Sequence, residues 1–351
     1  MKHYDEETLA AYADNPAAVA DPAAIERHLR ECDACQAEVA FLRSFDEALA
    51  DDATWEAVEL GEQLPSPSLN ALAEQTGSED REAELLLRDI IHHPIRFLWE
   101  DVASKLKYRT GGVVRRLCRE VPIVCERQPE FALDLATAAS AIAAKLPDKH
   151  YPANMIAGLR GLALKECGNA YWYLGDLQRA LAAFEAATTQ YRTLPVHDYA
   201  VARVDFSRAT VLRELERLDE ALLVVRGAGV IFERFGDSQR VQFARLLEGN
   251  ILHDLGRFDD ASGTLEAVHA AALAAHDDAL RARAAQNLAV IEIKQQALEH
   301  ARRHVIEALD LYASLEMETE RTRARWTIAL LLVAEGQLDR GIEQFRDVIN
   351  A

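Results

Sequence analysis

A repeat of 40 or 41 residues constrains the fold of this 351-residue chain more than any other feature. Small residues recur at two fixed places in five successive segments, at Gly168, Ala209, Gly249, Ala289 and Ala329 and then at Ala180, Ala221, Ala261, Ala301 and Gly341. A large apolar residue follows the second place by four positions, at Phe184, Val225, Leu265, Val305 and Phe345. The pattern predicts closely packed pairs of antiparallel helices that bury their apolar faces by stacking on neighbouring pairs.

The first copy of this repeat resembles the tetratricopeptide repeat at Gly168, Tyr171, Gly175, Ala180 and Phe184. The resemblance covers residues 158–351, in which five copies keep the same phase, and it implies an all-α solenoid of helical hairpins. The usual period of that family is about 34 residues. Each copy here is therefore roughly six residues longer, enough to lengthen both helices by about a turn.

Residues 91–157 precede the clear copies and are expected to form a helical N-terminal part of the array with degenerate repeats. Apolar positions in 113–157 predict at least one further helical pair there. Cys118, Cys125 and Cys167 lie in apolar helical contexts, so we expect buried and unreactive thiols.

Residues 1–50 are predicted to form a separate module of three short helices. Asp21 followed by Pro22 is typical of a helix start, because the aspartate caps the helix and proline suits its first turn. The second helix is expected to include both His28 and Cys32, whose i and i+4 spacing would place them on one face.

The spacing His28-x3-Cys32-x2-Cys35 favours a metal site, and His3, the only histidine before His28, is the candidate fourth ligand. Two imidazoles and two thiolates suit one tetrahedral Zn²⁺ ion, and a closed four-ligand site is structural rather than catalytic. Bound metal would also explain how so small a module folds. The alternative is a dithiol redox pair, but thioredoxin-like chemistry expects a strand before the motif, and the sequence predicts none.

His3, His28, Cys32 and Cys35 together resemble the four zinc positions of the zinc-binding anti-sigma factor domain of bacteria, over residues 1–50. The resemblance implies that the module and the helix after it bind an alternative sigma factor and block its access to core polymerase and promoter. Members that sense oxidants use an additional cysteine near the first ligand position, where this chain has His3. We therefore expect signals to act on the repeats rather than through oxidation of Cys32 and Cys35.

Acidic residues are concentrated in the N-terminal third. Residues 1–91 contain 22 Asp and Glu against 6 Lys and Arg, a net charge of −16, whereas the remainder contains 36 against 33, a net charge of −3. Such a field repels nucleic acid and anionic lipid and attracts basic protein surfaces. Residues 51–90 are predicted to be an acidic linker with a candidate partner-binding helix, and the basic stretch KLKYRTGGVVRR that follows is expected to neutralise it.

Other features favour a cytoplasmic protein without catalytic activity. No apolar run approaches the roughly 18 residues that span a bilayer, and the start MKHYDEE lacks a secretion signal. No phosphate-binding glycine loop, nucleophile elbow or motif-fixed carboxylate pair occurs, so we expect no enzyme. His300 and His304 lie one helical turn apart without a zinc-protease motif, and we interpret them as solvated helix surface.

These features predict an anti-sigma-like transcriptional regulator. In this hypothesis the zinc module and the acidic helix bind a sigma factor, and the array binds a second regulatory protein or peptide. The alternative is a tetratricopeptide scaffold or peptide receptor in a bacterial signalling or protease-controlled complex, with the zinc module purely structural or docking.

Overall fold

The computed structural model describes residues 3–4, 8–9, 12–13, 16, 19, 21–30, 32, 35–36, 39–40, 67–88, 91, 102 and 104–349. Contacts divide the chain into two units, Met1–His197 and Asp198–Ala351. Every regular element in the described residues is a helix, which confirms the predicted all-α class. Within the same residues, no helix combines the length and the apolarity needed to cross a membrane.

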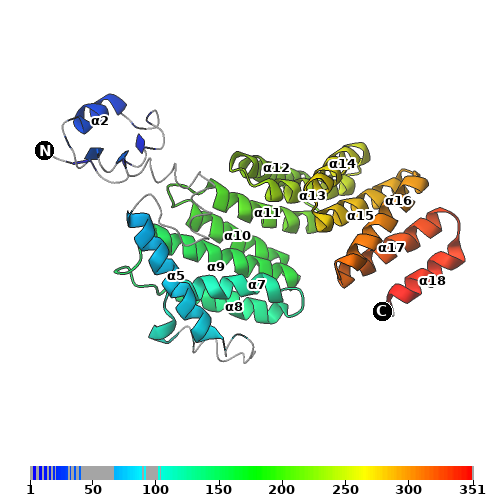
Figure 1. Ribbon diagram of the computed structural model, residues 1–351, viewed down its shortest axis with the longest axis horizontal. Coiled ribbons are helices and arrows are strands. Elements are labelled where there is room, and N and C mark those ends of the chain that lie inside the picture. Colours follow the sequence, from blue (N-terminus) through cyan, green and yellow to red (C-terminus); the bar gives the residue numbers. More distant parts are fainter. Residues whose placement is uncertain are drawn as a thin grey trace. The chain divides into compact units, whose positions relative to one another are not determined.

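The helices of the first unit are α2 (Pro22–Leu29), α5 (Pro67–Leu87), the 3-10 turn η2 (Leu106–Tyr108), α7 (Gly111–Val124), α8 (Pro129–Ala143), α9 (Ala153–Tyr173) and α10 (Leu177–Tyr191) (Figure 1). Those of the second unit are α11 (Asp198–Glu214), α12 (Leu218–Arg234), α13 (Ser238–Asp254), α14 (Phe258–Ala274), α15 (Asp278–Lys294), α16 (Leu298–Ser314), α17 (Glu318–Ala334) and α18 (Leu338–Ile349).

Helix α2 begins as the sequence predicts but ends earlier. The Asp21 carboxylate accepts a hydrogen bond from the Ala24 amide at 3.0 Å, and Pro22 occupies the first turn. The helix stops at Leu29, so the expectation that it includes Cys32 is wrong. Cys32 instead lies outside the helix, with its Sγ 3.3 Å from His3 Nδ1.

Helix α5 occupies much of the segment predicted to be a linker. It runs through the sequence QTGSED, whose polar residues and Gly77 have weak helix propensity. Ala83 and Leu87 are fully buried in a core shared with α7, and this tertiary contact overrides the weak local propensity. Residues 51–66 and 92–101 of the predicted linker and array start lie outside the described residues.

Helices α7 and α8 form the further pair expected in residues 113–157, and they pack in turn against α9. Helices α9 and α10 are the first clear repeat copy. Their tightest approach is at Gly168, where an added Cβ would lie 2.4 Å from the Phe184 ring. A small residue on one helix thus makes room for the large residue on its partner, as the repeat pattern predicts.

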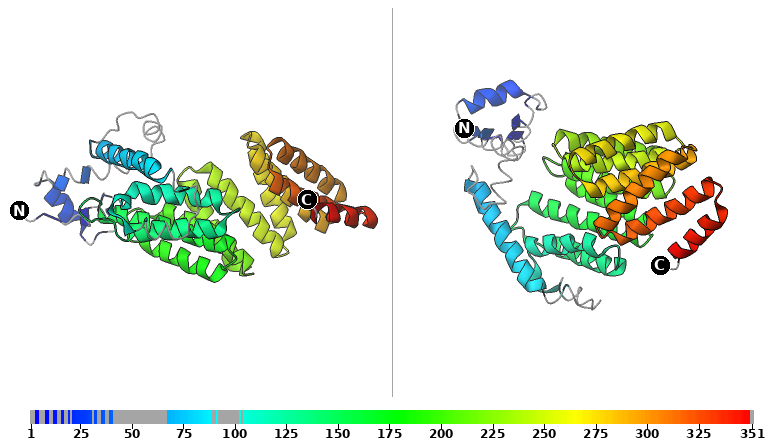
Figure 2. Two further views of the ribbon diagram at one scale, coloured as in Figure 1. Left: turned by 90° about the horizontal axis from the view of Figure 1, so that it is seen from below. Right: turned by 45° about the vertical axis from the view of Figure 1, so that its right-hand side comes forward.

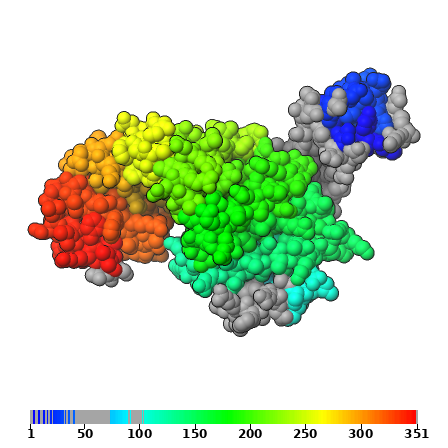
Figure 3. Space-filling view, turned by 180° about the vertical axis from the view of Figure 1, so that it is seen from behind, coloured from blue at the N-terminus to red at the C-terminus, as the bar shows by residue number. Residues whose placement is uncertain are grey.

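The second unit contains the remaining four copies, with helices of 17 residues up to α17. Consecutive helices pack as hairpins, and α11, α13, α15 and α17 also contact one another side by side, so they form one layer and line one face. Both views in Figure 2 show the hairpins following one another in sequence order. Figure 3 shows the same order on the surface of this unit, from green through yellow to red.

Left-handed turn residues mark the repeat in the second unit. The turns inside the hairpins place Glu216, Gly256, Gln296 and Gly336 at positive φ, and the turns between hairpins do the same with Gly236, His276 and Glu316. Both series follow the repeat period of 40 residues. Glycine fills only part of these positions, although it is the residue that adopts this conformation without strain.

Candidate metal centre

Four side chains from separate parts of the N-terminal module converge. His28 lies in the last turn of α2, Cys32 follows that helix, Cys35 is helical, and His3 lies outside any helix near the N-terminus. One ligand atom from each residue lies within 4.8 Å of the other three. The structure therefore brings together all four residues that the sequence singled out.

The distances fit a tetrahedral site. His3 Nδ1 lies 3.3 Å from Cys32 Sγ and 3.5 Å from Cys35 Sγ, and His28 Nε2 lies 3.3 Å from Cys35 Sγ. Tetrahedral zinc with ordinary bond lengths separates a nitrogen and a sulfur ligand by about 3.5 Å. The four donors thus have the spacing of a coordination shell, and the cluster is a candidate metal site.

Apolar residues surround the two thiols. Cys32 and Cys35 are buried with only 6% and 3% of their surface exposed, in a small core with Leu9, Tyr12 and Ile25. A partly buried aromatic ring covers the histidine side, with Tyr4 edge-on to the His28 ring at 5.0 Å between centroids. Among the described residues this core contains few large side chains, so a metal would supply much of the cohesion of the module.

The other three cysteines lie in the helical core of the first unit rather than at this site. Cys118, Cys125 and Cys167 are buried among apolar residues of α7 to α9. Burial raises the pKa of the Cys125 and Cys167 thiols to about 12, so they stay protonated at neutral pH and are poor nucleophiles. The interpretation of these residues as buried, unreactive thiols agrees with this geometry.

The second unit contains a polar cluster that sequence reasoning missed. His304 on α16 lies 2.9 Å from the Glu292 carboxylate on α15, and its ring lies 5.7 Å from that of His269 on α14. Glu307 contacts His269 at 3.2 Å and also pairs with Arg281. His304 is thus partly buried and paired, and its interpretation as solvated helix surface is wrong, whereas His300 is exposed.

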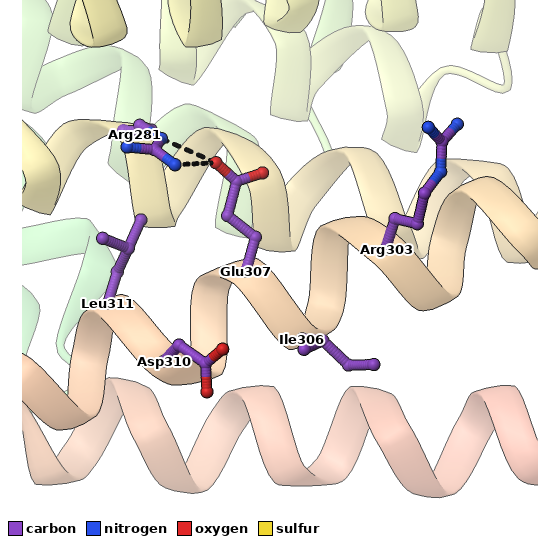
Figure 4. A pocket seen from close by; sticks show the side chains of 6 residues that line it. All are labelled: Arg281, Arg303, Ile306, Glu307, Asp310 and Leu311. Carbon is purple, nitrogen blue, oxygen red and sulfur yellow. Dashed lines mark hydrogen bonds and ion pairs between the residues drawn. The ribbon is translucent and has the colours of Figure 1, made fainter.

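Glu307 and Arg281 also line a shallow surface groove, together with Arg303, Ile306, Asp310 and Leu311 (Figure 4). The ion pair between Arg281 and Glu307 crosses from α15 to α16, and Asp310 points to the opposite side of α16. The signal for this cluster was the repeat phase itself, because His269 and Glu307 are 38 residues apart and meet only when consecutive hairpins stack.

Family models match two segments of the chain. Residues 6–36 match a family described as "Putative zinc-finger", and residues 167–193 match the tetratricopeptide repeat. These matches confirm both resemblances. The first 50 residues are called the zinc-finger module from here on. The matched segment contains His28, Cys32 and Cys35 but not His3, which was expected from the sequence as the fourth ligand and which the structure places beside the other three.

Solved structures share the repeat fold. A protein from P. vanneervenii described as BtubC (BKLC) matches with a TM-score of 0.52 and 17% identity, over 64% of this chain and 92% of that one. NprR in complex with its cognate peptide NprX matches with a TM-score of 0.52 and 14% identity, over 76% of each chain. The Rap conjugation gene regulator of the plasmid pLS20, in complex with the Phr* peptide, matches with a TM-score of 0.50 and 15% identity, over 68% of this chain and 74% of that one. Comparison with curated proteins finds no match.

Proposed function

We propose that this protein is a zinc-dependent anti-sigma regulator whose repeats receive a second protein or peptide. The observation that carries the proposal is the convergence of His3, His28, Cys32 and Cys35 in a module that matches a zinc-finger family and precedes a strongly acidic segment. The two family matches support regulatory protein binding, and we extend this proposal to a sigma factor as the partner.

Zinc is the ion that suits this donor set. Two buried thiolates and two imidazoles are soft to borderline ligands, which favour Zn²⁺ over Mg²⁺ or Ca²⁺. Four protein ligands leave no coordination position for a substrate, so the ion would hold the module together and take no part in a reaction. We accordingly propose a protein with no enzymatic activity, acting in the cytoplasm.

Charge supports the choice of partner. The N-terminal third has a net charge of −16, and sigma factors present basic DNA-binding surfaces. An acidic protein steers toward such a surface and covers it, which excludes promoter DNA by competition. The same field makes direct DNA binding by this part of the chain unfavourable.

The array is the proposed receiver of the signal. Its layer of helices α11, α13, α15 and α17 presents polar side chains, including Asn250 and Asn287, whose amides join across α13 and α15 at 2.7 Å. The related folds of NprR and of the pLS20 regulator were solved with bound peptides, which supports the same class of ligand for these repeats. A stacked array offers an extended face suited to such ligands.

Capture of partners from the source cell tests the proposal. The full-length chain is used as bait beside two variants, Cys32→Ser/Cys35→Ser in the zinc-finger module and His300→Ala on an exposed face of α16. We expect a sigma factor to be recovered by the wild-type chain and the His300→Ala control but lost from the double cysteine variant. Recovery of no sigma factor, or equal recovery by all three, contradicts the proposal.

A peptide receptor or scaffold without a sigma partner is the second candidate. It is favoured by the extent of the repeats, which fill the whole of the second unit, and by the peptide complexes among the related folds. In this case partners bind the array equally well when Cys32 and Cys35 are both replaced by serine. The same capture experiment therefore separates the two functions.

A further inference from the structure

The carboxylate of Glu79 on α5 lies against the start of α7. Glu79 Oε2 accepts a hydrogen bond from the Gly112 amide at 3.0 Å, and Glu79 Oε1 accepts one from the Tyr151 hydroxyl at 2.8 Å. The Tyr151 oxygen in turn accepts from the Gly111 amide at 3.0 Å. A carboxylate is favoured at a helix N-terminus, because it satisfies free amides and opposes the helix dipole.

Two arginines of α7 form ion pairs with acidic residues of α5. Arg115 pairs with Asp80 at 2.9 Å and with Glu79 at 3.5 Å, and Arg116 pairs with Glu84 at 2.6 Å. Both arginines belong to the basic stretch KLKYRTGGVVRR, and these contacts show it neutralising the acidic segment as expected. Three of the five acidic side chains in residues 73–88 are therefore bound by the chain itself.

The apolar part of this contact comes from Ala83 and Leu87, with Leu86 partly buried against the same core. Ala83 and Leu87 are fully buried, whereas Leu85 remains 64% exposed on the other side of α5. The side chains of Asp80 and Glu84 stay 30% and 54% exposed, so their ion pairs add little net stability. A helix held mostly by such pairs is expected to open locally far more readily than the hairpins behind it.

Glycine makes the close approach of α5 feasible. A Cβ at position 112 would lie 2.3 Å from the backbone oxygen of Glu79 and 2.9 Å from the amide nitrogen of Asp80. Any side chain at this position must therefore push α5 away. The contact depends on two features of α7, its glycine N-terminus and its arginines, which face the same stretch of α5.

We propose that α5 is a latch, whose acids Glu79, Asp80 and Glu84 are held by α7 in the closed form and bind a basic protein surface in the open form. The same carboxylates cannot satisfy both partners, so latch closure and partner binding exclude each other. The identity of the basic partner as a sigma factor rests on the proposed function, but the latch itself requires only a basic surface.

The latch gives ligands of the first unit a means of control. The apparent affinity for the partner is the intrinsic affinity multiplied by the fraction of molecules whose latch is open. A ligand of the first unit that stabilises the closed form weakens partner binding, and the partner weakens that ligand by the same factor. The acidic segment is thus a regulated surface rather than a constantly available one.

Gly112→Ala opens the latch without changing any residue of α5. Alanine is a better helix former than glycine, so α7 itself is not weakened. Gly158→Ala in α9 is the matched control, because a Cβ there meets no atom within 4 Å. Tyr151→Phe is a second opening variant, which removes the hydroxyl that bonds Glu79 while keeping the buried ring.

Hydrogen exchange of the full-length chain gives the first test. We expect amides of residues 73–88 to exchange at least about fivefold faster in Gly112→Ala and Tyr151→Phe than in the wild type or Gly158→Ala, with α9 and α10 unchanged. Equal exchange in residues 73–88 for all four proteins overturns the latch. Faster exchange throughout α7 to α10 also overturns it, because it shows α5 to be an inseparable part of the core.

Binding of a basic probe gives the second test. The probe is an 18-residue amphipathic peptide of lysine and leucine, titrated against the same four proteins. We expect about fivefold tighter binding to the two opening variants, and loss of that gain when Glu79→Gln and Glu84→Gln are added to Gly112→Ala. Equal affinity for all proteins contradicts the proposal. If both tests give the expected results but no sigma factor is captured, the latch is supported and the sigma partner is refuted.

Discussion

The zinc-finger module and the repeat unit Asp198–Ala351 differ in what holds them together. The module has a core of a few side chains around four converging donor atoms, whereas the repeat unit buries an apolar residue at every period of its sequence. One fold depends on a single chemical group, and the other spreads its stability over many similar contacts. The comparison predicts that loss of the metal site unfolds the whole module, whereas a substitution in the repeats lowers the stability of the array by a limited amount.

The largest expected effect is metal removal. Chelation of the full-length protein, or Cys32→Ser/Cys35→Ser, is expected to abolish protection from hydrogen exchange in residues 21–40, because the remaining apolar core is too small to fold alone. Helices α11 to α18 should keep their wild-type protection. The matched control is His300→Ala, which should behave as wild type in both regions. Loss of protection in the repeats as well would show that the two regions are not independent.

The next effect concerns the close helix contacts of the repeats. Gly249→Ala places a Cβ 2.6 Å from Leu265, and we expect it to destabilise the second unit by about 1–3 kcal/mol through overpacking. Gly263→Ala on α14 has no atom within 4 Å of the new Cβ and is expected to stabilise by about 0.5–1 kcal/mol. Urea unfolding of both variants measures the difference. Equal unfolding free energies for the two variants would contradict the role of small residues in close helix contacts.

A smaller effect should appear at the turns between hairpins. His276 has a φ of 54°, so His276→Gly removes left-handed strain and is expected to stabilise by up to about 1 kcal/mol. His300→Gly in helix α16 is the matched control and should destabilise by about 1 kcal/mol. Both are measured by urea unfolding. A destabilised His276→Gly would indicate that the imidazole itself supports the turn.

The smallest expected effect is the pH dependence of the stability that the polar cluster around His304 provides. The hydrogen bond to Glu292 raises the pKa of His304, helped by the charge of Glu307 and opposed by burial and by Arg303. A raised pKa in the folded state means that this stabilisation is full below about pH 6.5 and is lost as pH rises through the folded value.

The comparison variant for this cluster is His304→Gln, which keeps a hydrogen-bonding side chain but no titrating group. Wild type should exceed this variant in unfolding free energy at about pH 5.5, and the gap should shrink by about pH 8.5. His300→Gln, at an exposed position on the same helix, should show no such change. A pH effect that persists in His304→Gln would show that His304 is not its source.

The repeats were predictable from sequence because their physics is periodic. The close contact between Gly168 and Phe184 follows from a pattern that recurs in five copies. In the structure the Phe184 ring packs against Gly168 as the pattern requires. Phe345 departs from it, since this last copy leaves the ring partly exposed against Trp326 with centroids 4.5 Å apart.

Features that depend on distant contacts were less predictable. The sequence identified the four residues of the candidate metal site by type and spacing, but it placed Cys32 on α2, which ends at Leu29. Helix α5 was expected to be mainly linker, because its stability comes from α7 rather than from its own sequence. His304 was assigned to solvent for the same reason, since Glu292 approaches it from another helix.

Metal content of the purified full-length protein tests the central claim most directly. Elemental analysis after dialysis is expected to find about one zinc per chain in the wild type and in His300→Ala, a weakened zinc affinity in His3→Ala, and none in Cys32→Ser/Cys35→Ser. A natively purified wild-type protein without bound metal, or one whose zinc is unaffected by the double cysteine variant, would contradict the account.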